Sequence, residues 1–155
     1  MKNIEILKLK ELGVLNISAH CLDSTEAYKV VLFRRSLRVA LDSIITAEQE
    51  LLGVAGIDDP VAFDKELDTL RQAKGKDERQ LAVLSDLEAK LAKYRSLREK
   101  LMSDDAPDLK KPLFTYERWK LLQDENCRNG HDPLSGLAED LLHGIMWVDP
   151  DETTT

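Results

Sequence analysis

The sequence predicts an all-α protein, an elongated bundle of five or six helices in which the long helices pack antiparallel and a small helical cap follows in the C-terminal part. Composition favours helix over sheet, because only 5% of the residues are aromatic whereas Leu, Ala, Glu, Lys and Arg dominate. Apolar residues recur at spacings of three and four along several long segments. Glycines and Asp-Pro pairs separate these segments, as is typical between helices.

The first segment, Asn3 to Leu12, fits a short helix that ends at Gly13, a residue suited to a left-handed cap. Ile4 and Ile6 also fit the alternation of a strand, and the stretch VLNIS behind Gly13 is ambiguous in the same way. Residues 3–18 are therefore open between helix and strand.

The clearest helix begins near Asp23, which has the spacing of a reciprocal capping pair with Glu26. A broad apolar stripe that follows this pair in the sequence predicts a helix from Glu26 to Leu52, and Gly53 is expected to end it. At ~1.5 Å per residue this helix would be about 40 Å long. The stripe comprises Ala27, Val30, Leu37, Ala40, Leu41, Ile44, Ala47 and Leu51.

A shorter helix is predicted to open where Asp58 or Asp59 precedes Pro60, since proline suits the first helical position. The stripe behind it ends at Gly75, where we expect the chain to turn back rather than continue as one helix. Asp77 and Gln80 then have the spacing of a capping box and open the next helix.

Residues Glu78 to Met102 carry the most regular periodicity, a narrow leucine seam of coiled-coil type. We expect this seam to pack against the long helix of Glu26 to Leu52, with pairing between two chains as the alternative. The candidate contact residues of the seam are Leu84, Leu87, Leu91, Tyr94 and Leu101.

The polar stretch SDDAPDLKKP separates the long helices from a distinct C-terminal part. Thr115 is placed to cap a helix that Asn129-Gly130 ends, and Asp132 before Pro133 repeats the signal for a helix start. A last apolar stripe follows at Leu134, Leu137, Leu141 and Ile145.

The chain of 155 residues is long enough for one hydrophobic core, so we expect a single domain over 1–155. Within it the long-helix bundle would occupy 1–103, the C-terminal helical cap 112–148 and a flexible tail 149–155. The composition, 43% apolar and 33% charged, is that of a folded chain.

Charge and cysteine usage narrow the classes of function. The 29 acidic and 22 basic residues give a net charge of -7, which disfavours nucleic acid as a partner. Two cysteines do not make a disulfide framework, so we expect a reducing, cytoplasmic setting. Because no apolar run approaches membrane-spanning length and the first residues lack the apolar core of a signal peptide, we expect no membrane association.

Two short stretches, SAHCLDS and CRNGHDPLSG, place cysteine beside histidine. A zinc site is disfavoured because His20 and Cys21 are adjacent, whereas zinc ligands are commonly two to four residues apart. Nor does a local signature of a nucleophile surround Cys127. The second stretch is explained as a helix end, a turn and a helix start, which leaves His131 in an exposed turn. We therefore predict no metal site, no cofactor and no catalytic residue.

Three further side chains, Arg34, Arg35 and Arg38, form a compact basic cluster on the long helix, which would suit phosphate or an acidic partner. Asp42 lies one turn beyond Arg38, where an intrahelical ion pair can form. Trp119 and Trp147 are candidate contact residues if they are exposed, because large rings often anchor interfaces.

The segments EAYKVVLFRRSLRVALDSIITAEQELLGVAGI and KKPLFTYERWKLLQDEN resemble small phage and prophage proteins of unassigned function. The matching letters are Ala27-Tyr28-Lys29, Gly56-Ile57 and Pro112-Leu113. The resemblance implies a long amphipathic helix that ends near a Gly-Ile turn, and a short helix that begins after the Pro-Leu pair. It implies no activity and no site residue.

These observations favour a non-enzymatic helical module for protein interaction or assembly, of phage or mobile-element origin, that binds a protein partner or forms a homo-oligomer along its apolar stripes. The alternative is a small helical enzyme or phosphate-ligand binder that uses the arginine cluster. A cavity around Arg34 and Arg38 would favour that alternative.

Overall fold

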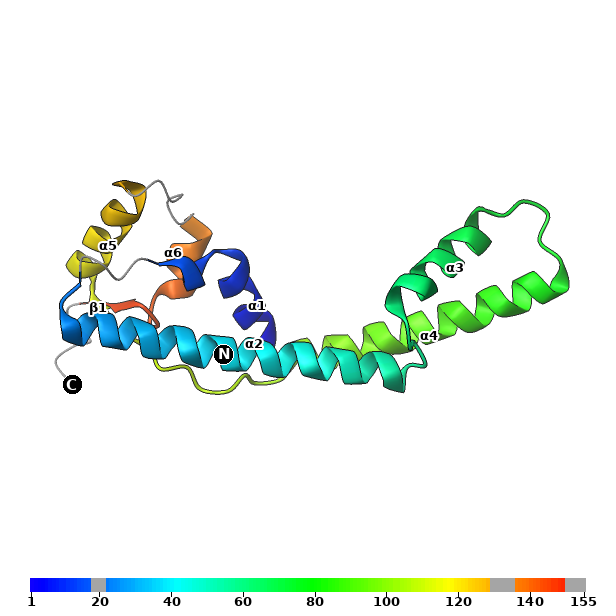
Figure 1. Cartoon of the computed structure of the whole chain (residues 1–155), viewed down its shortest axis with the longest axis horizontal. Coiled ribbons are helices and arrows are strands. Elements are labelled where there is room, and N and C mark those ends of the chain that lie inside the picture. Colours follow the sequence, from blue (N-terminus) through cyan, green and yellow to red (C-terminus); the bar gives the residue numbers. More distant parts are fainter. Residues whose placement is uncertain (18–21, 129–135, 150–155) are drawn as a thin grey trace. The chain divides into compact units, whose positions relative to one another are not determined.

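A computed structural model describes residues 1–17, 22–128 and 136–149 of the chain (Figure 1). Six α-helices lie within them, and the predicted all-α class is confirmed. The helices are α1 (Asn3–Glu11), α2 (Ser24–Val54), α3 (Pro60–Gln72), α4 (Glu78–Ser103), α5 (Tyr116–Arg128) and α6 (Gly136–Leu142). A 3-10 helix, η1 (Val14–Asn16), and two short strands, β1 (Phe114–Thr115) and β2 (Trp147–Val148), complete the regular structure of these residues.

The chain divides into two compact units. Met1–Asp42 and Asp105–Thr155 form the first, here called the terminal unit, and Ser43–Asp104 form the second, the hairpin unit. The boundary between the predicted bundle of 1–103 and cap of 112–148 differs from this division, because α6 packs on α1 within the terminal unit. That both units act as one domain stays a prediction, and the predicted tail lies outside the described residues except for Asp149.

The N-terminal segment is helical, which decides between the two alternatives for residues 3–18 as far as they are described. Gly13 has φ of 73° and ends this part in the left-handed conformation expected of it. Ile6 and Leu9 of α1 are fully buried in the core of the terminal unit. That core also includes Val30, Phe33, Leu37, Trp119, Leu122, Leu142 and Met146.

Helix α2 begins as predicted, with the Asp23 carboxylate accepting a hydrogen bond from the backbone N–H of Glu26 at 2.8 Å. Its predicted end at Gly53 is wrong, because the helix continues to Val54 and the chain leaves it at Gly56 with φ of 84°. The N–H of Gly56 donates to the carbonyl of Gly53, and the N–H of Ile57 donates to the carbonyl of Leu52. This pair of bonds is a Schellman motif, which requires glycine at position 56 and only tolerates it at position 53.

Local signals place the start of each helix in the α3–α4 hairpin. The Asp59 carboxylate accepts from the N–H groups of Val61 and Ala62, and the capping box of Asp77 with Gln80 opens α4. Gly75, with φ of 66°, lies in the turn between the helices, so the predicted reversal there is confirmed. The short connection brings α3 back along α4 as an antiparallel neighbour.

The strands were not expected from the sequence. Leu113 and Phe114 donate their N–H groups to the carbonyls of Ile145 and Met146, and β1 pairs with β2 in parallel. Two-residue strands leave no alternation for a sequence pattern to show. The predicted cap at Asp132 and Pro133 lies outside the described residues.

Candidate interaction surfaces

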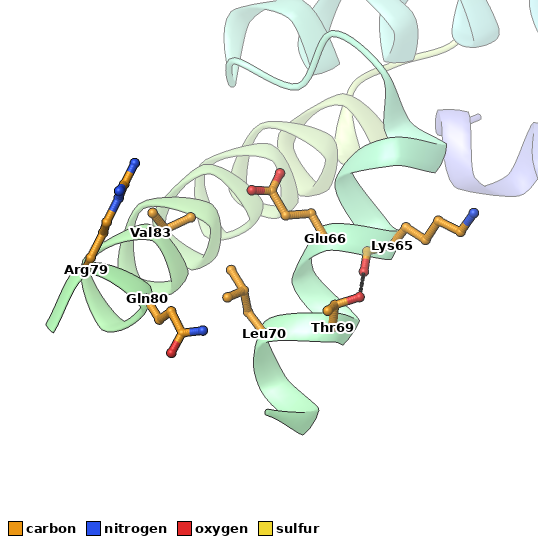
Figure 2. A pocket seen from close by; sticks show the side chains of 7 residues that line it. All are labelled: Lys65, Glu66, Thr69, Leu70, Arg79, Gln80 and Val83. Atoms are coloured by element: carbon orange, nitrogen blue, oxygen red, sulfur yellow. Dashed lines mark hydrogen bonds between the residues drawn. The ribbon is translucent and has the colours of Figure 1, made fainter. Parts of the chain in front are cut away.

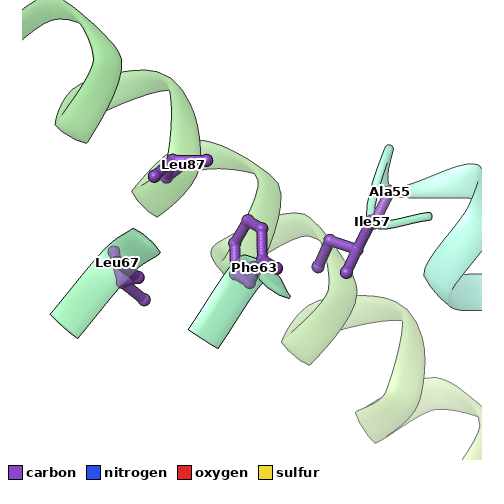
Figure 3. Packing of buried hydrophobic residues seen from close by; sticks show 5 residues of the cluster. All are labelled: Ala55, Ile57, Phe63, Leu67 and Leu87. Carbon is purple, nitrogen blue, oxygen red and sulfur yellow. The ribbon is translucent and has the colours of Figure 1, made fainter. Parts of the chain in front are cut away.

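The leucine seam of α4 forms the core of the hairpin unit. Figure 3 shows Leu87 of α4 beside Phe63 and Leu67 of α3, with Ala55 and Ile57 from the turn that follows α2 in the sequence. The partly buried residues packed on this cluster are Leu52, Leu70, Leu84, Leu91 and Tyr94.

The seam was expected to pack against the long helix α2, and this expectation is wrong in its main part. The seam packs chiefly on α3, while α2 contributes Leu52, because the short turn at Gly75 makes α3 the immediate neighbour of α4. Leu101 is half-buried and lies outside the cluster. Leu84, Leu87, Leu91 and Tyr94 are thus occupied within one chain, so the seam is not a free surface for a second chain.

A groove of about 450 Å³ opens between α3 and α4 near their connected ends. Figure 2 shows Leu70 of α3 and Val83 of α4 facing the space between the helices, with the charged side chains of Lys65 and Arg79 at its margins. Glu66, Thr69 and Gln80 complete the lining. The groove can accept an apolar side chain between charged walls.

Helix α4 has a second face, here called the outward face, which points away from the seam. Its residues recur at spacings of three and four, and all are exposed. They are Leu81, Ala82, Ser85, Ala89, Ala92 and Ser96. Asp86 and Lys93 flank the outward face on one side, and Glu88 and Arg95 flank it on the other.

Weak ion pairs hold two of these flanking carboxylates within the chain. Asp86 Oδ2 lies 3.3 Å from Lys90 Nζ, and Glu88 Oε1 lies 3.5 Å from Arg71 Nε. All four side chains are more than one third exposed, so both pairs contribute little to stability. The carboxylates are therefore able to exchange these partners for a cation on another molecule.

The three residues of the arginine cluster differ in their exposure. Arg35 and Arg38 are exposed and Arg34 is half-buried, its Nε without a hydrogen-bond partner among the described residues. Burial lowers the pKa of the Arg34 guanidinium, and the positive charge of Arg38 lowers it further. The ion pair with Asp42 that the sequence allows is not formed between the described side chains.

The two tryptophans have different environments. Trp119 is 1% exposed and lies in the core of the terminal unit, so it is not a surface contact. Trp147 is half-buried and lies beside Tyr116 and His143. Their aromatic group was not recognised from the sequence, because Tyr116 and Trp147 meet only through the pairing of β1 with β2.

Neither a metal site nor a membrane span is found in the described ranges. They contain no group of three or more His, Cys, Asp or Glu side chains that could hold a metal ion. His20, Cys21 and His131 lie outside these ranges, as does the side chain of Cys127. No helix within them combines the length and apolarity needed to cross a bilayer.

Comparisons with known proteins found no matching family model, no matching curated protein and no matching solved structure.

Proposed function

We propose that this protein is a non-enzymatic interaction or assembly module that pairs with a second copy of itself through the outward face of α4. The observation that carries this proposal is the charge pattern on the flanks of that face, Asp86 with Lys93 and Glu88 with Arg95. Each flank changes sign over seven residues, which is two helical turns. The exposed Ala and Ser side chains between the flanks allow a second helix to approach closely.

An antiparallel arrangement satisfies the charges next to the middle of this face. With Ala89 opposite Ala92 of the second copy, Asp86 lies near Lys93 of that copy and Glu88 lies near Arg95. By symmetry each of these attractions occurs twice. The antiparallel arrangement also sets Arg79 near Lys100 of the second copy, one like-charged contact that the two kinds of attraction outweigh. In a parallel arrangement a single attraction, Glu88 with Lys93, is offset by the like-charged contact of Arg95 with Lys100. The pattern therefore favours an antiparallel dimer.

Sedimentation velocity or light scattering at micromolar concentration tests the proposal. We expect the full chain to be a dimer that weakens as salt is raised, because exposed charge pairs are screened. Only monomer over this concentration range would overturn the proposal.

Two complementary variants test the face itself. Lys93→Glu with Arg95→Glu makes both flanks acidic, and Asp86→Lys with Glu88→Lys makes both basic. We expect each double variant to be monomeric on its own and a mixture of the two to form heterodimers. Lys110→Glu with Lys111→Glu, two exposed residues of the terminal unit, is the matched control and should leave the dimer intact. If the control and the acidic variant dissociate equally, α4 is not the contact.

The cytoplasmic setting and the phage or mobile-element origin are part of this proposal. The first is supported by the pair of cysteines without a disulfide framework, and the second by the resemblance of the two quoted segments. The net charge of -7 supports a protein partner rather than nucleic acid, so the protein should pass through a heparin column at moderate salt.

A further inference from the structure

The terminal unit contains a cavity of about 300 Å³ that is separate from the surfaces of α4. Three rings and three carboxylates line it, and they come from α5, α6 and the segment around β2. The lining residues are Tyr116, Glu139, Asp140, His143, Trp147 and Asp149. A volume of this size accommodates a small ligand group.

The rings form a continuous aromatic wall with Trp147 at its centre. The Trp147 ring lies 4.9 Å from the Tyr116 ring and 4.5 Å from the His143 ring, measured between centroids. The interplanar angles are 54° and 42°, so the rings are tilted rather than stacked flat. An aromatic face carries negative electrostatic potential and attracts a cation within about 6 Å of its centre.

Among the described residues that line the cavity, the charged side chains all have one sign. Glu139, Asp140 and Asp149 are acidic, and the six lining residues include no lysine or arginine. Asp149 Oδ2 lies 3.4 Å from His143 Nε2, which brings this carboxylate to the edge of the aromatic wall. Carboxylates beside aromatic faces favour a cation over an anion or a neutral ligand.

The chain already places a cation on one of these rings. Lys120 Nζ lies 5.1 Å from the centre of the Tyr116 ring, although Lys120 does not line the cavity. The Tyr116 ring therefore already makes a cation–π contact, and Trp147, whose ring lies 4.9 Å from it, carries the type of ring that binds cations best.

Backbone hydrogen bonds fix the cavity before any ligand arrives. The N–H of Phe114 donates to the carbonyl of Met146 at 2.7 Å, and the N–H of Gly144 donates to the carbonyl of Trp147 at 2.8 Å. The N–H of His143 donates to the carbonyl of Glu139 at 3.0 Å. A site ordered in this way loses little conformational entropy on binding.

We propose that this cavity binds a small alkylammonium group, such as the quaternary ammonium of choline or of a trimethylated lysine side chain. An alkylammonium group spreads its charge over methyl groups that contact ring faces, while the carboxylates at the wall complement the charge. Inorganic cations fit less well, because no described group of acidic side chains converges closely enough to ligate a metal ion.

The first test compares choline with 3,3-dimethylbutan-1-ol, its neutral isostere of nearly the same shape. Binding to the full chain would be followed by tryptophan fluorescence and by the chemical shift of the Trp147 indole N–H. We expect saturable binding of choline with a Kd on the order of 1 mM and binding of the isostere about tenfold weaker. No saturable binding of choline, or equal binding of the two compounds, would overturn the proposal.

Variants then assign the binding to this cavity. Trp147→Leu should abolish choline binding, and Glu139→Gln with Asp149→Asn should weaken it several-fold. Asp108→Asn, an exposed change outside the cavity, should leave it unchanged. The carboxylate variants keep the test decisive if Trp147→Leu fails to fold, since all three of the other changes are on exposed residues. Choline binding that survives the carboxylate double variant at full strength would contradict the proposal.

A peptide with one trimethyl-lysine distinguishes the two sources of the ligand. Tighter binding of this peptide than of choline, with the unmethylated peptide bound more weakly, would identify a side chain of a partner protein as the ligand. Tighter binding of choline would identify a free small molecule. Either result supports the cavity as an alkylammonium site, whatever the oligomeric state of the chain proves to be.

Discussion

Arg118 on α5 binds the carboxylate of Glu26 on α2 at two points, with Nε 2.9 Å from Oε2 and Nη2 2.5 Å from Oε1. The two residues are 92 positions apart, so this fork ties the first turn of α2 to the C-terminal part of the terminal unit. The Glu26 side chain is 18% exposed and that of Arg118 is 38% exposed. A planar guanidinium suits this two-point geometry, whereas an ammonium does not.

We expect Arg118→Lys to destabilise the terminal unit by about 0.5–1 kcal/mol, a small value because solvent screens a pair that is partly exposed. Urea unfolding followed by tryptophan fluorescence measures this unit, since Trp119 and Trp147 both lie in it. Arg35→Lys, the same change at an exposed residue of α2 in the terminal unit, is the control. Equal effects of the two variants would show that the two-point geometry is unimportant.

Shortening a leucine of the seam should destabilise the hairpin unit. Leu87 is 6% exposed and packs beside Phe63 and Leu67, so Leu87→Ala should cost about 2–4 kcal/mol from lost burial and the remaining cavity. Val61→Ala on α3, at a side chain 76% exposed, should change stability by less than about 0.5 kcal/mol. Loss of the circular dichroism signal at 222 nm in urea measures both variants, and a small effect of Leu87→Ala would contradict the seam as a core.

The two glycines at the end of α2 should respond to alanine with opposite signs. Gly53 lies inside the helix with open space around its Cβ position, so Gly53→Ala should stabilise the protein by about 0.5–1 kcal/mol. Gly56 has φ of 84°, so Gly56→Ala should destabilise it by about 1 kcal/mol or more through backbone strain. Thermal unfolding of both variants tests this, and stabilisation by Gly56→Ala would contradict the left-handed turn.

Acid should weaken the N-terminal end of α2. The hydrogen bond from the backbone N–H of Glu26 holds the pKa of the Asp23 carboxyl below its ordinary value. A carboxyl with a lowered folded-state pKa stabilises the fold above its unfolded pKa of about 3.9, and this contribution disappears as pH falls through the folded value. Asp105 behaves in the same direction, because the hydrogen bond from Lys2 lowers its pKa.

We therefore expect the melting temperature to fall as the pH is lowered below about 4, and Asp23→Asn to reduce this dependence while its amide oxygen keeps the cap. Thermal unfolding across that range measures the slope. Asp68→Asn, an exposed change on α3, serves as the control. An identical slope for the wild type and Asp23→Asn would show that the cap does not titrate in this way.

Sequence signals located most helix starts because they are local. Asp59 before Pro60 and the Asp77–Gln80 box each involve atoms within three or four residues, so the letters alone suffice. The end of α2 shows where such signals stop being sufficient. Gly53 and Gly56 are both plausible ends in the sequence, and the choice between them depends on the burial of Ala55 and Ile57 against α3 and α4.

The candidate sites were less accessible to sequence analysis than the helices. The leucine seam was identified with its correct period, but its partner helix was not, because many apolar stripes satisfy the same period. Trp119 was selected as an aromatic contact and is buried. Trp147 was selected as well, but its contacts with Tyr116 and His143 were not foreseen.

By itself the sequence determined the all-α class, the turns at Gly13 and Gly75 and the apolar face of each long helix, since these follow from backbone preferences and from spacing within one segment. Tertiary structure alone decided which helix covers the leucine seam and which face of α4 remains exposed. It also decided that β1 and β2 bring Tyr116 to Trp147. These features depend on contacts between residues that are far apart in the chain. The free energy of such contacts cannot be read from the spacing of residues within one segment.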